Sequence, residues 1–438
     1  MKLQHLGVLD FAFPLQTPET ASAGDDTGSD FRIASALGPT LAQWITSHRD
    51  LPLRLNQYTS AFSRESSTGP FLRSYQYLVQ EAYSAHLTQD DTCEERDQVL
   101  DIYSALYREL LAVPVVKGYR SASNDEPKTN ILLGYLPTLN QWIEAGAYRE
   151  LGRAISREYD ITVWAPPFLS SEKTDENPIH VRQNTWTLTT SSIGLMILTH
   201  ADDRGLVIPP RIAPTQVLLL PKTLSPLRLA VEDRQILLDE IDTIRATLAR
   251  RGIRVVADLR DVYSHAWKWN EGLVKGVPVA ISFGMDELRD RVATLYRRDR
   301  EEEEYGWKVQ VGIRDLETEV PRLLGEIQDE LFRRADKRFS LNSRQVEIWD
   351  DFAPGFCAEQ ADRNGFGGCL APHCLDDGCG SEVETLVAGA GQEALAASTP
   401  SVKRVCIPWD QPEGTEGKKC INPNCTSPAK KWAMFGCK

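Results

Sequence analysis

The sequence predicts an α+β fold over residues 1–210, a compact α/β domain over residues 211–312 and a separate C-terminal domain over residues 313–438. Before residue 190, apolar and polar residues alternate in several short segments, which is the period of half-buried strands. From residue 211, short apolar strands alternate with amphipathic helices, as in α/β domains. Eight of the nine cysteines lie between Cys357 and Cys437 and set the last region apart.

In the first region, the residue pattern predicts a helix near residues 40–50, with Leu41, Trp44 and Ile45 on one face. A second predicted helix covers residues 93–111, with an apolar stripe at helical spacing formed by Val99, Ile102, Leu106 and Leu110. Antiparallel strands are predicted at residues 51–58, 75–86, 129–136 and 140–146. Residues 183–200 predict a strand followed directly by a buried helix.

In the second region, strands are predicted at residues 215–221, 253–260 and 277–284, with helices at 231–252 and 269–276 between them. A charged helix follows at residues 321–339 and is expected to bury Leu324, Ile327 and Leu331. Residues 387–401 are rich in Ala, Gly and Ser and predict a flexible linker.

Composition narrows the function classes. The 438-residue chain has a formal net charge of −13, which excludes a general polyanion binder, so a nucleic-acid partner would need a local basic face. No run approaches the roughly 18 apolar residues of a membrane span, and the N-terminus lacks the pattern of a secretory signal. We therefore expect a cytoplasmic protein without a membrane partner.

Six segments in order carry a family resemblance: Arg49–Gln57, Pro70–Arg73, the pair Gln80–Glu81 followed by His86, Thr199–Pro214, Lys268–Pro278 and Pro428–Gly436. Together they resemble prolyl-tRNA synthetase of the archaeal and eukaryotic type, from about residue 5 to the C-terminus. The resemblance implies a class II synthetase antiparallel sheet, an α/β anticodon-binding domain and a zinc-containing C-terminal domain. The family's first class II motif, which forms much of its dimer interface, lies upstream of Met1, so the oligomeric state stays open.

The second motif departs from the family, which places an Arg-x-Glu pair on a strand to hold the α-phosphate. Here Arg64 and Glu65 are adjacent, so Ser63 is expected at the phosphate-facing position, because a one-residue slip turns strand side chains to the other face. The family's Thr-Arg-Glu-Phe is replaced by residues 74–77, SYQY.

The third motif departs as well, because the family ends it with an arginine that grips the ATP γ-phosphate. This chain has Thr189-Thr190-Ser191 there. A charge-assisted hydrogen bond contributes about 1.5–3 kcal/mol, and losing one in a transition state costs roughly 10²–10³ in rate. The proline pocket also differs at residues 33–37 and at Ala147-Tyr148-Arg149. We therefore expect no prolyl-adenylate formation and no ATP.

These losses favour a tRNA-dependent acyl transferase that uses aminoacyl-tRNA charged by another enzyme and forms a cyclic dipeptide. The frame is similar to fungal arginine-containing cyclodipeptide synthases, and Glu81 would suit an arginyl group, although an inherited structural contact is an equal alternative. Candidate acyl carriers or bases are Glu81, Tyr83, Ser63, Ser191 and Tyr148. Expected substrate contacts are Arg64, Glu65, Arg73, Gln80, His86, Thr189 and Arg149. His86 and His200 match family positions, where a structural role is the more common one.

Two alternatives remain open: a non-catalytic paralogue that binds tRNA or a synthetase, and an atypical prolyl-tRNA synthetase. In the anticodon-binding region, Lys268 and Lys275 match basic family positions and are expected to contact tRNA. The Arg and Glu that read tRNA bases in the family are absent from Pro278–Ser282. We therefore expect this region to bind tRNA without distinguishing a proline tRNA from other tRNAs. Ordinary solvated lysines are the alternative.

Two cysteine pairs in the last region, Cys374 with Cys379 and Cys420 with Cys425, suit a closed structural zinc site with four thiolates. Cys369 and Cys406 are competing ligands, and free buried thiols are the other alternative. Zinc here would stabilise the fold and take no part in catalysis.

Overall fold

A computed structural model describes residues 37–62, 71–72, 76–120, 128–164, 178–225, 228–301, 306–341, 343–357, 367–392 and 402–437. The chain forms two compact units, one of residues 1–51 with 153–181 and one of residues 52–152 with 182–438. None of the described helices combines the length and apolarity that a membrane crossing requires.

The smaller unit holds helical residues 37–44, the 3-10 turn η3 (His48–Asp50), α3 (Ala154–Glu158) and the hairpin of β6 (Thr162–Val163) and β7 (Ile179–His180). Leu41 and Ile45 are buried and Trp44 is half-buried, which agrees with the predicted apolar face. The predicted bounds 40–50 are wrong, because the helix ends at residue 44. Ser47 begins η3 because its side chain accepts a hydrogen bond from the Arg49 N–H group.

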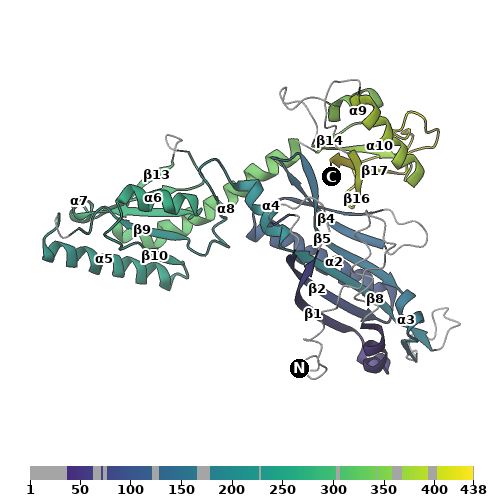
Figure 1. Ribbon diagram of the computed structural model, residues 1–438, viewed down its shortest axis with the longest axis horizontal. Helices are drawn as coiled ribbons and strands as arrows, with labels where there is room; N and C mark the ends of the chain where they lie inside the picture. Colours follow the sequence, from purple (N-terminus) through teal and green to yellow (C-terminus); the bar gives the residue numbers. More distant parts are fainter. Residues whose placement is uncertain are drawn as a thin grey trace. The chain divides into compact units, whose positions relative to one another are not determined.

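A ten-stranded sheet dominates the larger unit, in the order β1-β2-β8-β5-β4-β3-β16-β17-β15-β14 (Figure 1). Neighbouring strands are antiparallel except β14 and β15, which are parallel. Five of the first six strands confirm the predicted antiparallel layout, and the sixth, β3, was not predicted. The strands are β1 (Leu53–Phe62), β2 (Gln76–His86), β3 (Val115–Tyr119), β4 (Lys128–Leu136), β5 (Gln141–Gly152), β8 (Arg182–Thr189), β14 (Ser343–Gln345), β15 (Gly368–His373), β16 (Val402–Pro408) and β17 (Lys431–Cys437).

Helix α2 (Gln89–Ala105), a π-helical turn η4 (Leu106–Leu110) and α4 (Ser191–His200) cover one face of this sheet. The predicted apolar stripe of α2 is wrong in part, because Ile102 is 65% exposed and Leu110 is 40% exposed. Leu100, Tyr103 and Tyr107 are buried instead. Both stripes have helical spacing, so the sequence could not decide which one faces the sheet.

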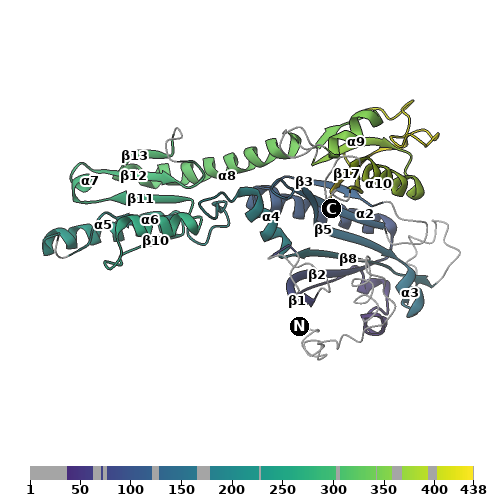
Figure 2. The ribbon, with the colours of Figure 1, turned by 45° about the horizontal axis from the view of Figure 1, so that its top comes forward.

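A five-stranded sheet has the order β10-β9-β11-β12-β13. Its strands are β9 (Val217–Pro221), β10 (Val255–Ala257), β11 (Val279–Phe283), β12 (Val292–Arg297) and β13 (Lys308–Gly312). Helices α5 (Val231–Arg250), α7 (Met285–Arg289) and α8 (Leu316–Leu341) bury one large core against it (Figure 2). This core includes Leu324, Ile327 and Leu331, as predicted. Helix α6 (His265–Val274) packs Trp269 against a second cluster around Leu218.

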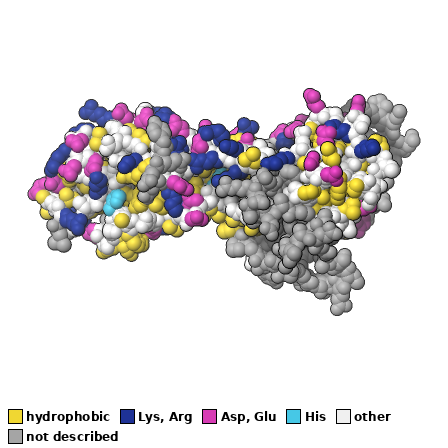
Figure 3. Space-filling view, turned by 90° about the horizontal axis from the view of Figure 1, so that it is seen from above, with side chains coloured by type: hydrophobic (Ala, Val, Ile, Leu, Met, Phe, Trp, Pro, Cys, Tyr) yellow, Lys and Arg dark blue, Asp and Glu magenta, His cyan; other side chains and the backbone are white. Residues whose placement is uncertain are grey.

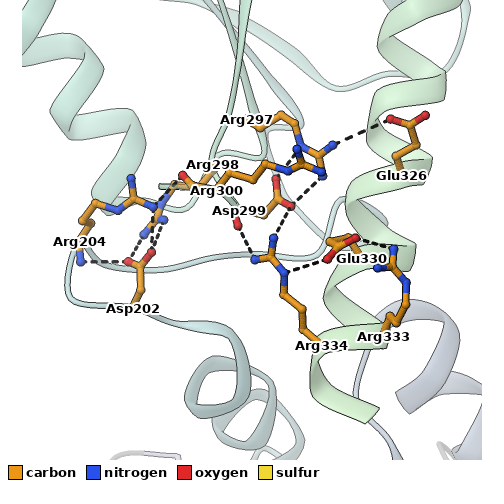
Figure 4. Close-up of polar contacts among 10 residues, drawn as sticks. All are labelled: Asp202, Arg204, Arg297, Arg298, Asp299, Arg300, Glu326, Glu330, Arg333 and Arg334. Carbon is orange, nitrogen blue, oxygen red and sulfur yellow. Dashed lines mark hydrogen bonds and ion pairs between the residues drawn. The ribbon is translucent and has the colours of Figure 1, made fainter. Parts of the chain in front are cut away.

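An ion-pair network joins the segment after α4, the end of β12 and α8 (Figure 4). The buried Arg298 guanidinium donates to both carboxylate oxygens of Asp202, at 2.6 and 2.7 Å. Arg297 pairs with Asp299 at 2.8 Å, and Arg334 donates to the Asp299 carbonyl oxygen at 2.6 Å. Two parallel N–H···O hydrogen bonds to one carboxylate hold a planar guanidinium group in one orientation.

The C-terminal region adds α9 (Trp349–Cys357), α10 (Asp377–Gln392) and four strands. It continues the first sheet, because Ile407 and Pro408 of β16 pair with Tyr119 and Gly118 of β3. The Trp142 indole N–H donates to the Gly367 carbonyl oxygen at 2.7 Å. The predicted linker at 387–401 is wrong at its start, because α10 continues to Gln392; residues 393–401 lie outside the described residues.

Candidate functional site

The two faces of the large sheet separate the predicted site residues. Gln80 and Glu81 are consecutive in β2, so their side chains leave on opposite faces. Strand pairing places Glu81 between Gln57 of β1 and Thr187 of β8. In the next row, Thr185 of β8 pairs with Tyr83 of β2 on one side and with Arg149 of β5 on the other. We call Glu81, Tyr83, Arg149, Gln183 and Thr185 the polar face.

Glu81 is a buried carboxylate without an ion-pair partner among the described residues. It is 4% exposed, and its Oε2 atom accepts a hydrogen bond from Gln57 Nε2 at 3.2 Å. The Oε1 atom has no hydrogen-bond partner within the described part of the chain. Burial raises the pKa of Glu81 above its ordinary value, and the Gln57 hydrogen bond opposes that shift.

Tyr83, Gln183 and Thr185 are also at most 4% exposed. The Thr185 hydroxyl has no hydrogen-bond partner among the described residues, whereas the Tyr83 hydroxyl lies near the Gln183 amide, which opposes the effect of burial on the pKa of Tyr83. Burial raises the pKa of Tyr83 well above its ordinary value. Gln183 and Thr185 were not predicted as site residues, because a Gln and a Thr in a strand give no chemical signal by themselves.

Arg149 is the one predicted cationic substrate contact on this face that the structure describes. Its Nη2 atom lies 3.8 Å from Glu144 Oε1, and Arg120 Nη2 lies 2.7 Å from Glu144 Oε2. The charge of Arg149 is therefore partly balanced within the protein.

The third-motif position has hydroxyl groups in place of a cation. The Thr189 and Ser191 hydroxyls are 2.6 Å apart, and the Ser191 N–H donates to Thr189 Oγ1 at 3.2 Å. These groups bond to one another at the start of α4. The second-motif residues Ser63, Arg64, Glu65 and Arg73, and the segment 33–36, lie outside the described residues.

Glu95 organises the opposite face of the sheet. It was not predicted as a site residue, because it lies in a charged run that resembles a solvated helix surface. Its buried carboxylate accepts hydrogen bonds from Arg54 at 2.8 Å, Ser84 at 2.5 Å and Tyr148 at 3.1 Å, and contacts His86 Nε2 at 2.9 Å. Two predicted site residues, His86 and Tyr148, thus lie in a closed network under α2, away from Glu81.

Two further predicted residues are held by neighbours. Gln80 donates to Asn56 Oδ1 at 2.6 Å and accepts from the Tyr103 hydroxyl, also on the α2 side. His200 Nε2 lies 2.9 Å from the Leu111 carbonyl oxygen, and burial lowers the pKa of His200 to about 4. These contacts fit a structural role for His200.

The two lysines expected at a tRNA surface differ. Lys268 is 4% exposed and donates to the Asp258 carbonyl oxygen at 3.1 Å, and burial lowers its pKa. Lys275 is 66% exposed and pairs with Glu271 at 2.6 Å. Of these two lysines, only Lys275 exposes its ammonium group and can contact a tRNA in this arrangement.

Beside Lys268 lies an exposed aromatic pair that the sequence-based analysis did not single out. The rings of Tyr263 and Trp267 stack with centroids 3.9 Å apart, and each side chain is 42% exposed. The Arg260 guanidinium carbon lies 5.0 and 5.2 Å from the two centroids. On the face shown in Figure 3, Lys and Arg side chains are interspersed with Asp and Glu.

Four predicted cysteine ligands gather in one cluster. The Sγ atoms of Cys379 and Cys420 are 3.6 Å apart, and those of Cys374 and Cys425 are 3.8 Å apart. Zinc–sulfur bonds of about 2.3 Å in a tetrahedron require sulfur atoms about 3.8 Å apart, and these two separations match that value. The group of donor atoms that all lie within 4.8 Å of one another includes Cys374, Cys379 and Cys420 but not Cys425. His373 is a fifth possible donor, since its ring lies with Cys374, Cys379 and Cys420 within 4.8 Å.

The competing cysteines lie elsewhere. Cys369 and Cys406 are buried in two hydrophobic clusters of the C-terminal sheet, apart from the four-cysteine cluster. Asn422 supports the cluster, because its amide donates to Cys379 Sγ at 3.2 Å and to Glu382 at 2.9 Å. The cluster could therefore hold a metal ion.

Comparison with known proteins connects these features. Residues 216–323 match the family "Anticodon binding domain", and residues 357–438 match "Prolyl-tRNA synthetase, C-terminal". An Arabidopsis thaliana protein named cytoplasmic proline–tRNA ligase is 32% identical over 96% of this chain and 75% of the relative. The chain belongs to the prolyl-tRNA synthetase family. This confirms the resemblance of the six segments.

Other members of the family are longer. A Saccharomyces cerevisiae protein provisionally named a proline–tRNA ligase is 34% identical over 91% of this chain, which spans 56% of that relative. A bifunctional glutamate/proline–tRNA ligase of Drosophila melanogaster is 31% identical over 98% of this chain, which spans 24% of that relative.

Proposed function

We propose that this member of the prolyl-tRNA synthetase family acts on aminoacyl-tRNA made by another enzyme and does not activate an amino acid with ATP. The observation that carries the proposal is the start of α4, where Thr189 and Ser191 hydrogen-bond to each other at the position that a phosphate-gripping cation occupies in the family. Neutral hydroxyl groups stabilise a developing phosphate charge far less than an arginine does.

The proposed reaction is acyl transfer between two aminoacyl-tRNAs. The α-amine of one aminoacyl group attacks the ester carbonyl of the other, a C–N bond forms, and the ester C–O bond breaks. The amine proton moves to the leaving ribose oxygen. A second attack of the same kind closes a cyclic dipeptide, and no phosphate takes part.

For tRNA docking we infer the exposed stack of Tyr263 and Trp267, with Arg260 beside it. Lys275 follows at the C-terminal cap of α6, the helix that holds Trp267 and Lys268. Aromatic rings bind unpaired bases by stacking, whatever the base, and arginine adds a cation–π contact. This platform suits a tRNA partner whose sequence is not read. In the four-cysteine cluster we infer a structural zinc ion, which would stabilise the C-terminal region and supply no catalytic group. A cytoplasmic location remains our expectation.

One experiment tests the reaction. The purified protein is incubated without ATP with total tRNA charged by a synthetase mixture and freed of those enzymes, and the products are analysed by mass spectrometry. Dipeptides or cyclic dipeptides are expected. Proline-dependent exchange of pyrophosphate into ATP, with no peptide product, would overturn the proposal.

The second candidate is an atypical prolyl-tRNA synthetase, which the names of the relatives favour. The segments at residues 63–70 and 73–75, which hold Arg64 and Arg73, bear on it directly and lie outside the described residues. A mixture of proline, ATP and uncharged tRNA separates the two functions, because only this candidate yields prolyl-tRNA.

A further inference from the structure

The four cysteines of the cluster differ in their access to solvent. Cys374, Cys379 and Cys420 are 3%, 9% and 7% exposed, whereas Cys425 is half-buried and both of its neighbours in the chain are exposed. The group of donor atoms within 4.8 Å of one another also leaves Cys425 out, so this residue lies at the edge of the cluster. A small reagent from solvent therefore reaches Cys425 before it reaches the other three thiols.

Cys425 has a second thiol within reach. Its Sγ atom lies 3.8 Å from Cys374 Sγ. A disulfide bond has an S–S distance of about 2.05 Å, so the two sulfur atoms must approach by about 1.8 Å to form one. The Cys425 N–H donates to the Asn422 carbonyl oxygen at 3.1 Å, and the Asn422 amide donates to Glu382 of α10 at 2.9 Å. These bonds hold the Cys425 loop beside α10 and keep the two thiols close together.

Cys93 offers a comparison within the same chain, because it is also half-buried. Its Sγ atom accepts a hydrogen bond from the Gln89 amide at 3.5 Å and one from the Arg96 guanidinium at 3.8 Å. Neither of these described neighbours is a thiol. Access to solvent is thus common to both cysteines, and the neighbouring thiol distinguishes Cys425.

We propose that Cys425 is an oxidation site for hydrogen peroxide and that it forms a disulfide with Cys374, which opens the metal cluster. The Cys425 thiolate attacks one peroxide oxygen, an S–O bond forms, the O–O bond breaks and hydroxide leaves, which gives a sulfenic acid. The Cys374 thiolate then attacks the sulfenic sulfur, the S–S bond forms, the S–O bond breaks and a second hydroxide leaves. The two sulfur atoms are oxidised and the two peroxide oxygens are reduced, so the step balances with one peroxide for each disulfide.

The disulfide removes two of the four thiolates that we infer as zinc ligands. A structural zinc ion needs a closed set of deprotonated ligands, so the ion should leave when the disulfide forms. Reduction by a dithiol restores both ligands. Peroxide would in this way control the stability of the C-terminal region. Only the release of metal rests on the proposed zinc ion, since the two thiols react without it.

Peroxide treatment of the zinc-loaded full chain tests the inference. Equimolar hydrogen peroxide is added, the remaining thiols are alkylated with N-ethylmaleimide, and tandem mass spectrometry maps the linked cysteines. A chelating dye measures the released zinc. We expect the first disulfide between Cys374 and Cys425, release of zinc in proportion to that disulfide, and reversal of both by dithiothreitol with added zinc. Cys93 should form a sulfenic acid, trapped by dimedone, and no disulfide.

Variants separate the steps. In Cys374→Ser, the sulfenic acid at Cys425 should persist and be trapped by dimedone. In Cys425→Ser, Cys374 should stay reduced at the peroxide dose that links it in the unmodified chain, because buried structural thiols are inert. Cys93→Ser is the matched control and should leave the disulfide and the zinc release unchanged. Circular dichroism verifies that each variant is folded, and the trapping and mapping need no bound metal.

A first disulfide between Cys379 and Cys420, zinc that stays bound to the linked protein, or oxidation of Cys374 in folded Cys425→Ser would overturn the inference. So would a cluster that stays reduced while Cys93 is oxidised. The two metal proposals fail separately. A chain that binds no zinc and still forms the disulfide between Cys374 and Cys425 contradicts the zinc ion alone, and a zinc-loaded chain whose Cys425 resists peroxide contradicts the oxidation site alone.

Discussion

At the scale of single residues, Glu95 shows how a charged residue in a helix can belong to the core. Four neighbours surround its carboxylate, and three of them, Ser84, His86 and Tyr148, are buried on the α2 side of the sheet. Removing the negative charge leaves these polar groups poorly paired in a low-dielectric environment. Glu95 therefore acts as a structural anchor between α2 and strands β1, β2 and β5.

We predict that Glu95→Gln lowers the free energy of unfolding by about 2–4 kcal/mol, which is the usual range for breaking a buried charged network. Urea denaturation followed by circular dichroism measures this change. Glu94→Gln is the control, because Glu94 is exposed and accepts a hydrogen bond from Gln98 at 3.1 Å. Equal unfolding midpoints for the two variants would contradict the anchor role.

Asp202 gives a pH-dependent prediction. Burial alone would raise its pKa, but the hydrogen bonds and charge of Arg298 outweigh burial and lower the pKa of Asp202 to about 2 from 3.8. A carboxyl whose folded pKa is depressed stabilises the fold above its unfolded pKa. That contribution is lost as the pH falls from about 4 through 2.

Asp202→Asn should therefore destabilise the protein at pH 7 by about 1–2 kcal/mol, a value reduced for solvent screening because the Asp202 side chain is 36% exposed. The deficit relative to the unmodified protein should shrink to about half at pH 3. Urea unfolding at both pH values measures it, and the exposed neighbour variant Asp203→Asn should show no deficit at either. A deficit that grows on acidification would be incompatible with this linkage.

At the scale of secondary-structure elements, the segment from Arg260 to α6 presents the stacked pair of Tyr263 and Trp267. We predict that Trp267→Ala weakens tRNA binding by about 1–3 kcal/mol, the contribution of one stacked base, measured by filter binding at fixed salt. Ile236→Ala is the control, because Ile236 is 52% exposed on α5 of the same domain. Undiminished binding by Trp267→Ala would exclude the platform.

The cysteine cluster connects α10 with the loop before β17, so a metal ion would reinforce the hydrogen bonds by which Asn422 and Asn424 already join this loop to Glu382 of α10. We predict that Cys379→Ser loses the metal and lowers the melting temperature of the C-terminal region, because ion binding is coupled to folding. Elemental analysis by mass spectrometry gives the metal content. Cys369→Ala, in the neighbouring hydrophobic cluster, should keep the metal; retention by Cys379→Ser would rule out this ligand set.

At the scale of the whole molecule, the C-terminal strands extend the sheet that carries the candidate site. Trp142 of β5 is buried against Gly436 of β17, where a Cβ atom would lie 2.4 Å from the Trp142 ring. The C-terminal region thus packs directly against β5 of the ten-stranded sheet, in addition to any metal it holds.

We predict that Gly436→Ala destabilises the chain by about 1–3 kcal/mol through overpacking at this junction. Differential scanning calorimetry on the full chain measures the change. Gly325→Ala is the control, because nothing lies within 4 Å of its added Cβ in α8, and it should be neutral or stabilising. A melting temperature unchanged by Gly436→Ala would show that the junction is loosely packed.

The sequence by itself determined the strands β1, β2, β4, β5, β8, β9, β10 and β11, the helices α2, α4, α5, α6 and α8, the six family segments and the two cysteine pairs, but not β3 or the four C-terminal strands. These are local properties. The period of the apolar residues predicts helix or strand, and the spacing of the cysteines is read directly from the sequence. The burial of Leu324, Ile327 and Leu331 also followed from the sequence, because α8 has a single continuous apolar stripe.

Only the tertiary structure decided which residues share a site. Glu81 and Gln80 are neighbours in sequence, yet strand alternation turns one to the polar face and the other toward α2. Gln183 and Thr185 lie on the same face as Glu81 because of the register in which β8 pairs with β2. His86 lies on the opposite face, where it contacts Glu95. Strand pairing and the choice of the covered face depend on contacts between distant segments, and the sequence pattern does not encode them locally.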